Sequence, residues 1–100
     1  MNERAFSKYF KAFGDPSRLR ILMLLSSNEK TVNQIVKSIG LSQPTVSRHL
    51  TILREAEVVA SRRVKQNVYY SLNKKTVVIC CADFCDCLNI SGRGKKKGWK

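Results

Sequence analysis

The sequence predicts a mainly helical domain that ends in a small β-hairpin. Apolar side chains recur every three or four residues as far as Val59, which is the period of an α-helix. After Val59 the period changes to two, and two short strands flank the polar segment 65–67. The length of 100 residues suits one domain, which we place at residues 1–90. A Gly- and Lys-rich basic tail follows at 91–100, and its composition predicts disorder.

Two helices are expected before residue 28. Residues 3–13 carry four aromatic side chains at helical spacing, which indicates core packing or an interface with a second copy of the chain. Gly14 ends this helix. Asp15 and Pro16 start the next one, because Asp is a favoured N-cap residue and Pro fits the first helical turn. The second helix is expected to bury most of its apolar side chains, Leu19 among them, before a polar break at 28–30.

A helix-turn-helix pattern follows this break. Thr31 is the expected N-cap of a short helix that stops at Gly40, and Ser42 caps a longer helix that reaches residue 55. In such a pair the second helix enters the major groove of DNA with its N-terminal residues against base edges. Its outward side chains are types that bond to bases and phosphates, unless they form only a solvated polar face. We assign DNA contacts to Ser42, Gln43, Thr45, Ser47, Arg48 and His49.

The predicted hairpin carries basic residues near its tip. Its strands are VASRRV and VYYSL. A basic hairpin directly after a helix-turn-helix predicts a winged helix-turn-helix, with Arg62, Arg63 and Lys65 against phosphates or the minor groove. The alternative is an ordinary exposed hairpin, since edge strands often carry Lys and Arg for other reasons.

Charge and composition favour a nucleic-acid partner. Nineteen Lys and Arg residues face seven Asp and Glu residues, a net charge of +12 that is typical of a polyanion binder. No apolar run is long enough to cross a membrane and no secretory signal is seen, so we expect a cytoplasmic protein without a membrane partner. The chain has one histidine and no phosphate-binding loop, so we do not expect an enzyme.

Three segments resemble the ArsR/SmtB family of metal-responsive repressors: FKAFGDPSRLRILMLL, SIGLSQPTVSRHLTILREAEVV and SRRVKQNVYYSL. The resemblance spans about residues 5–73. It implies a winged-helix homodimer whose interface is formed by the first and last helices. It also implies a repressor that leaves its operator DNA when an inducer binds, with the DNA-reading helix starting at Gln43.

All four cysteines lie in a last helix that is expected to begin near Thr76: Cys80, Cys81, Cys85 and Cys87. Two sensor patterns of the family are missing, because the third helix has no cysteine and the last helix has no histidine. Clustered thiols select soft ions, so we predict a thiophilic metal or metalloid as inducer. As(III) ranks first, and Sb(III), Cd(II) and Zn(II) are further candidates.

The helical spacing limits how these thiols share an ion. Cys81 and Cys85 stand one turn apart, whereas Cys80 and Cys87 stand two turns apart. A larger ligand set therefore requires a frayed helix or cysteines from a second chain. Other interpretations stay open: Cys81 as a small buried apolar side chain, a thiol-redox switch of the same repressor, or a structural zinc in a DNA-binding protein.

Overall fold

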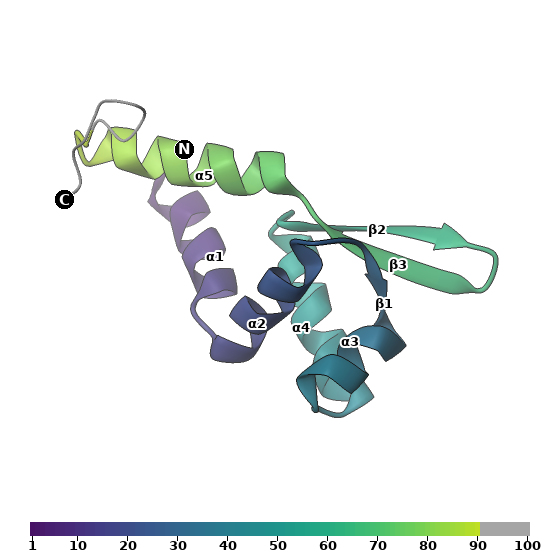
Figure 1. Cartoon of the computed structure of the whole chain (residues 1–100). Coiled ribbons are helices and arrows are strands. Elements are labelled where there is room, and N and C mark those ends of the chain that lie inside the picture. Colours follow the sequence, from purple (N-terminus) through teal and green to yellow (C-terminus); the bar gives the residue numbers. More distant parts are fainter. Residues whose placement is uncertain (91–100) are drawn as a thin grey trace.

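The computed structural model describes residues 1–90, so the predicted basic tail 91–100 lies outside the described residues. Residues 1–90 form five helices and a small sheet, arranged as in Figure 1, which confirms the predicted fold class. The elements in chain order are α1 (Glu3–Phe13), α2 (Pro16–Leu25), β1 (Lys30–Thr31), α3 (Val32–Ile39), α4 (Gln43–Glu55), β2 (Val59–Val64), β3 (Asn67–Leu72) and α5 (Lys74–Cys87). No helix within 1–90 combines the length and apolarity that a bilayer crossing needs.

Local capping signals account for the helix boundaries. The Asp15 carboxylate accepts hydrogen bonds from the backbone N–H groups of Ser17 and Arg18, at 2.9 and 3.1 Å. Thr31 and Gln34 form a reciprocal capping box at the start of α3. Each bond satisfies a backbone N–H group that has no partner inside its helix. The helix starts predicted from Asp15, Thr31 and Ser42 are therefore confirmed.

The structure differs from the predicted polar break at 28–30 in its last residue, because Lys30 belongs to strand β1. Lys30 and Thr31 pair antiparallel with Tyr70 and Tyr69, which turns the hairpin into a three-stranded sheet of order β1-β3-β2. A strand of two residues is too short to show a period-two pattern, so sequence periodicity cannot reveal it. The strand depends on the tertiary structure, because it is defined by its pairing with β3.

The helical core lies where α2, α3 and α4 meet the start of β2. Its fully buried side chains include Ile21, Ile35, Val46, Leu50, Leu53, Val58 and Val59. Leu19 does not join this core, contrary to the expectation, and 40% of it is exposed. The reason is helical phase: Ile21, Leu22 and Leu25 set the inner face of α2, and Leu19 falls beside Met23 on the outer face.

Helix α5 lies across α1, on the side of the molecule away from α3 (Figure 1). It begins at Lys74, two residues before the expected start, because Asn73 caps it through the N–H group of Thr76. The ring of Phe84 meets the rings of Phe6 and Phe10 edge to face, with centroids 5.2 and 4.6 Å away. Phe6 and Phe10 of the aromatic stripe therefore pack against α5 of the same chain, with Phe6 buried and Phe10 still 38% exposed, and the interface with a second copy stays a prediction.

Candidate nucleic-acid interface and thiol helix

The N-terminal turn of α4 presents an ordered polar surface. The Ser42 hydroxyl accepts from the N–H group of Thr45 and donates to the Thr45 hydroxyl, at 3.4 and 2.9 Å. Gln43, Thr45 and Arg48 are exposed, and Ser47 is half-buried. We call Ser42, Gln43, Thr45, Ser47 and Arg48 the reading patch. A helix N-terminus with exposed hydrogen-bonding side chains can receive a phosphate and the edges of bases.

His49 does not belong to this surface. Only 13% of its side chain is exposed, and its Nδ1 lies 3.2 Å from the Arg18 guanidinium on α2. The expected DNA contact of His49 therefore does not fit the structure, because its ring is directed at α2. The spacing of His49 from the apolar residues of α4 indicates this inward placement. His49 follows Val46 by three residues and precedes Leu53 by four, and both of those residues are fully buried.

The wing is formed by β2, β3 and their two-residue turn. Val64 pairs with Asn67, so the turn consists of Lys65 and Gln66, with Lys65 in a left-handed conformation at φ 58°. This conformation suits a tight hairpin, whose turns require positive φ to match the strand twist. Arg62, Arg63 and Lys65 are all exposed, as a surface for phosphates requires.

Arg62 differs from the other two cations because it is already paired. Its Nε donates to one carboxylate oxygen of Glu29 at 3.0 Å, and its Nη2 donates to the other. Its guanidinium also lies 5.3 Å from the ring centroid of Tyr69. The hydrogen bond from Arg62 lowers the pKa of Glu29, and the same bond raises the pKa of Arg62. Arg62 thus anchors the wing to the segment before β1. The sequence carries no local signal for Glu29 as its partner, because 33 residues separate the two.

The four thiols of α5 have different surroundings. Cys80 is fully buried, Cys85 is partly exposed, and Cys81 and Cys87 are exposed. Burial raises the pKa of the Cys80 thiol, and the nearby Cys81 and Asp83 raise it further. The alternative interpretation of Cys81 as a small buried side chain does not fit the structure, because Cys81 is exposed and Cys80 is the buried thiol. The inner face of α5 includes Val77, Cys80 and Phe84, and the next residue along the helix points about 100° away.

The thiols of a single chain supply only part of a metal site. Helix α5 continues through Cys87, so the fraying that would wrap one ion is not seen. Within residues 1–90, no three Cys, His, Asp or Glu side chains lie close enough together to hold an ion. Cys81 and Cys85, on successive turns, remain as a two-thiol pair. These residues fit two ligands of a soft ion, and any larger set has to come from a rearrangement or a second chain.

Comparison with known proteins agrees with this fold. The family described as bacterial regulatory protein, arsR family, matches residues 15–61. The transcriptional repressor SdpR of Bacillus subtilis (strain 168) is 45% identical over 64 residues, which cover 64% of this chain and 71% of SdpR. The transcriptional repressor SmtB homolog of Synechocystis sp. is 38% identical over 85% of this chain and 64% of its own length. The crystal structure of a possible transcriptional regulator for arsenical resistance superposes with a TM-score of 0.71 and 32% identity, covering 82% of this chain and 84% of the other.

The winged-helix fold, with its exposed reading patch, defines a class of DNA-binding transcriptional regulators rather than enzymes. Within that class, the chain belongs to the arsR family of bacterial regulatory proteins. The resemblance to the ArsR/SmtB family is thereby confirmed.

Proposed function

We propose that this regulator is a homodimeric repressor that leaves its operator DNA when a thiophilic metal or metalloid binds the thiols of α5. As(III) is the favoured ion. The observation that carries the proposal is the placement of Cys81, Cys85 and Cys87, which are open to solvent on the helix that packs against α1. Residues 1–90 form the domain that performs this function, and 91–100 form a separate basic tail. The protein acts in the cytoplasm, where thiols stay reduced.

Operator binding rests on the reading patch and on the two unpaired cations of the wing. Gln43 can pair with adenine, and Arg48 can pair with guanine or with a phosphate. Arg63 and Lys65 are exposed and have no ion-pair partner within residues 1–90, so they are free to bind phosphates. Two reading helices at a set distance are needed for two half-sites, which is why the active form is a dimer.

The dimer is supported by an apolar surface that α1 and α5 leave uncovered. Phe10, Val78, Ile79 and Leu88 are all more than one-third exposed, although each is a large apolar side chain. Burying such a surface against a second copy removes apolar area from water, which is the main favourable term in association. The thiol-bearing helix then belongs to the dimer interface itself.

The inducer site follows from this arrangement. Cys81 and Cys85 supply two thiolates, and Cys87 or the second chain supplies the rest. A bound soft ion supplies thiolate bonds that join these positions. Because α5 would form the interface, a change in its position alters the separation of the two reading helices. By linkage, the ion must weaken DNA binding by the same factor by which DNA weakens ion binding.

The proposal is tested by fluorescence anisotropy of the reduced, metal-free protein on a duplex from its own upstream region. We expect tight binding without an ion, and release by As(III) through an affinity loss of about tenfold or more. Sb(III), Cd(II) and Zn(II) are titrated in the same way. The double variant Cys81→Ser, Cys85→Ser should bind DNA normally and lose the response to As(III). Cys80→Ala tests the fourth predicted ligand, and we expect it to keep the response because the Cys80 thiol is buried in the folded domain.

The outcomes separate the alternatives. If the double variant still releases DNA on addition of As(III), the ion binds elsewhere and this site assignment is wrong. The exposure of Cys81 and Cys87 also favours a second candidate, a redox-responsive repressor, because accessible thiols can be oxidised. Release by an oxidant without any response to ions would identify that candidate. A requirement for zinc in folding would instead identify a structural zinc.

A further inference from the structure

We propose that Arg18 and His49 form a tie that positions the DNA-reading helix, so that operator affinity depends on both residues although neither touches DNA. The inference deepens the proposed function and rests on its operator binding. The starting observation is that one guanidinium group bonds to the end of α1 and to the middle of α4 at the same time.

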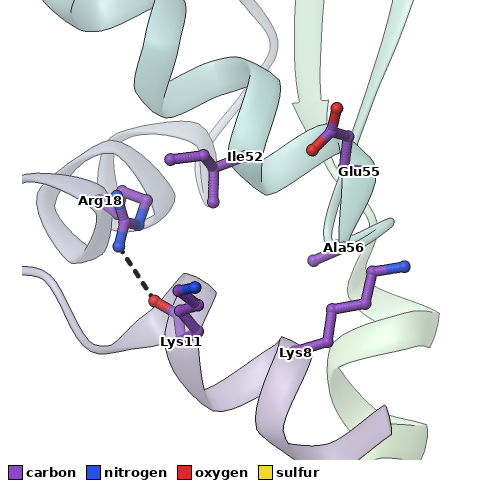
Figure 2. Close-up of a pocket in the computed structure, with 6 residues that line it drawn as sticks. All are labelled: Lys8, Lys11, Arg18, Ile52, Glu55 and Ala56. Atoms are coloured by element: carbon purple, nitrogen blue, oxygen red, sulfur yellow. Dashed lines mark hydrogen bonds between the residues drawn. The ribbon is translucent and has the colours of Figure 1, made fainter. Parts of the chain in front are cut away.

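Arg18 uses three nitrogen atoms for this purpose. Its Nε donates to the carbonyl oxygen of Ala12 at 2.9 Å, and its Nη2 donates to that of Lys11 at 3.0 Å. Figure 2 shows the second of these bonds as a dashed line. Both carbonyls belong to the last turn of α1, where backbone acceptors lack the next turn of helix, and that of Lys11 also accepts from the Gly14 N–H group at 3.3 Å. The remaining Nη1 faces Nδ1 of His49 at 3.2 Å. The planar fork of arginine can meet all three acceptors, and lysine cannot.

Asp15 lies on the other side of the His49 ring from Arg18. Arg18 can only donate, so Nδ1 of His49 is the acceptor in this contact, and Nε2 on the other side of the ring faces the Asp15 carboxylate at 4.0 Å, beyond hydrogen-bond distance. The same carboxylate caps α2 through the N–H groups of Ser17 and Arg18. The hydrogen bond from the Arg18 backbone N–H group is the main cause of the lowered pKa of Asp15, so the carboxylate remains charged at neutral pH. The end of α1, the start of α2 and the middle of α4 are thus joined through these three side chains.

Apart from the apolar core, which Ala12 of α1 shares with Leu50 and Leu53 of α4, few contacts hold α4 on this side. A cleft of about 240 Å³ lies between α1 and the C-terminal half of α4 (Figure 2). It is lined by Lys8, Lys11, Arg18, Ile52, Glu55 and Ala56. Within residues 1–90, the Arg18–His49 contact is the only side-chain hydrogen bond that joins α4 to α1 or α2. This contact therefore adds a directional polar link between α4 and the end of α1 to the apolar packing of the core.

This link affects specific binding more than non-specific binding. Hydrogen bonds to base edges need donor–acceptor distances within a few tenths of an ångström, so a small rotation of α4 breaks them. Long, flexible cations such as those of the wing can follow a phosphate through the same rotation. Loss of the tie should therefore lower affinity for the operator and leave affinity for random DNA nearly unchanged.

Four single variants isolate the tie. Arg18→Met removes the donor, and His49→Leu removes the acceptor. His49→Asn keeps an acceptor oxygen close to the position of Nδ1, and it should restore function although Asn favours helix less than Leu does. Lys11→Met is the matched control, because it removes one positive charge from the same cleft and its ammonium group makes no hydrogen bond there.

Each variant is titrated on operator and random duplexes over a range of salt concentrations. For Arg18→Met and His49→Leu we expect an operator affinity loss of about tenfold, the scale of a lost hydrogen bond to a charged group. Their affinity for random DNA should change by about twofold or less, and the salt slope on the operator should stay constant. His49→Asn and Lys11→Met should behave like the wild type. Equal losses on both duplexes, a reduced salt slope, or a His49→Asn variant as weak as His49→Leu would overturn the proposal.

Thermal unfolding gives a readout that needs no DNA. If Arg18 and His49 form one tie, the Tm losses of Arg18→Met and His49→Leu should not add in the double variant. Additive losses would show that the two residues act separately, and the inference would be wrong. Failure of the wild type to prefer its operator would instead remove the proposed function, while the double-variant result would still decide whether the tie exists.

Discussion

At the scale of single residues, the wing shows that neighbouring cations can have different roles. Arg62 and Arg63 are adjacent and both exposed, but within residues 1–90 only Arg62 has a carboxylate partner. The lowered pKa of Glu29 means that this ion pair stabilises the fold above the unfolded-state pKa of the carboxyl group. That contribution is lost only as the pH falls through the lower, folded-state pKa. At neutral pH the pair is intact, so Arg62 holds the wing in place, and we assign the phosphate contact to Arg63.

The salt dependence of operator binding tests this division. Arg63→Gln should lower the slope of log affinity against log salt by about 0.9, because one phosphate contact is lost. Arg62→Gln should change the slope much less, because its charge is already balanced by Glu29. Glu29→Gln is the control, since it frees Arg62 and should leave the slope equal or steeper. A larger change for Arg62→Gln than for Arg63→Gln would reverse the assignment.

At the scale of elements, the turn between α3 and α4 depends on Gly40. This residue ends α3 at φ 83°, and its N–H group bonds to the carbonyl oxygen of Val36 at 2.9 Å. A side chain at this position would meet no atom within 4 Å, so space does not exclude one. The requirement for glycine is conformational, because other residues are strained in the left-handed region.

Gly40→Ala should therefore lower the free energy of unfolding by about 1 kcal/mol, the cost of a left-handed alanine. For a domain of this size the Tm should fall by about 4–8 °C. Gly40→Asn should cost less, because Asn tolerates this conformation better. Urea and thermal denaturation measure both effects. An alanine variant as stable as the wild type would show that position 40 does not need positive φ.

At the scale of the whole molecule, the α1–α5 layer presents the apolar surface that we assign to the dimer. Val78 and Ile79 are 64% and 47% exposed on α5, beside the buried Cys80. The same helix therefore faces the core through Cys80 and solvent through its neighbours. A second copy is the occupant that suits this surface, because the reading helix of one chain can serve only one half-site.

Ile79→Lys should weaken the dimer, since a charge would have to be buried in an apolar interface without a partner. Light scattering after size exclusion should show a shift toward the monomer at micromolar concentration. Operator affinity should fall with it, because one reading helix is lost from each complex. Met23→Lys is the matched control, because Met23 is 65% exposed on α2, a helix outside the α1–α5 layer. A dimeric Ile79→Lys variant would place the interface elsewhere.

Helix boundaries, the hairpin and other features of local chemistry could be predicted from the sequence alone. Caps at Asp15, Thr31 and Ser42 and the stop at Gly40 act within one turn of backbone, so they can be predicted from adjacent residues. The change of period after Val59 predicted the hairpin, because strand alternation is also a local property. These signals were sufficient for the helix-turn-helix, the wing and the position of the thiol helix.

The side of each element that faces a partner depends on the tertiary structure and could not be predicted from adjacent residues. His49 turns toward Arg18, Arg62 pairs with Glu29, and Cys80 rather than Cys81 is buried. The first two contacts join residues 31 and 33 positions apart, and strand β1 exists only because β3 lies beside it. The physical reason is common to all of them. A helix or strand limits the directions available to a side chain, but the partner that fills one direction comes from elsewhere in the chain.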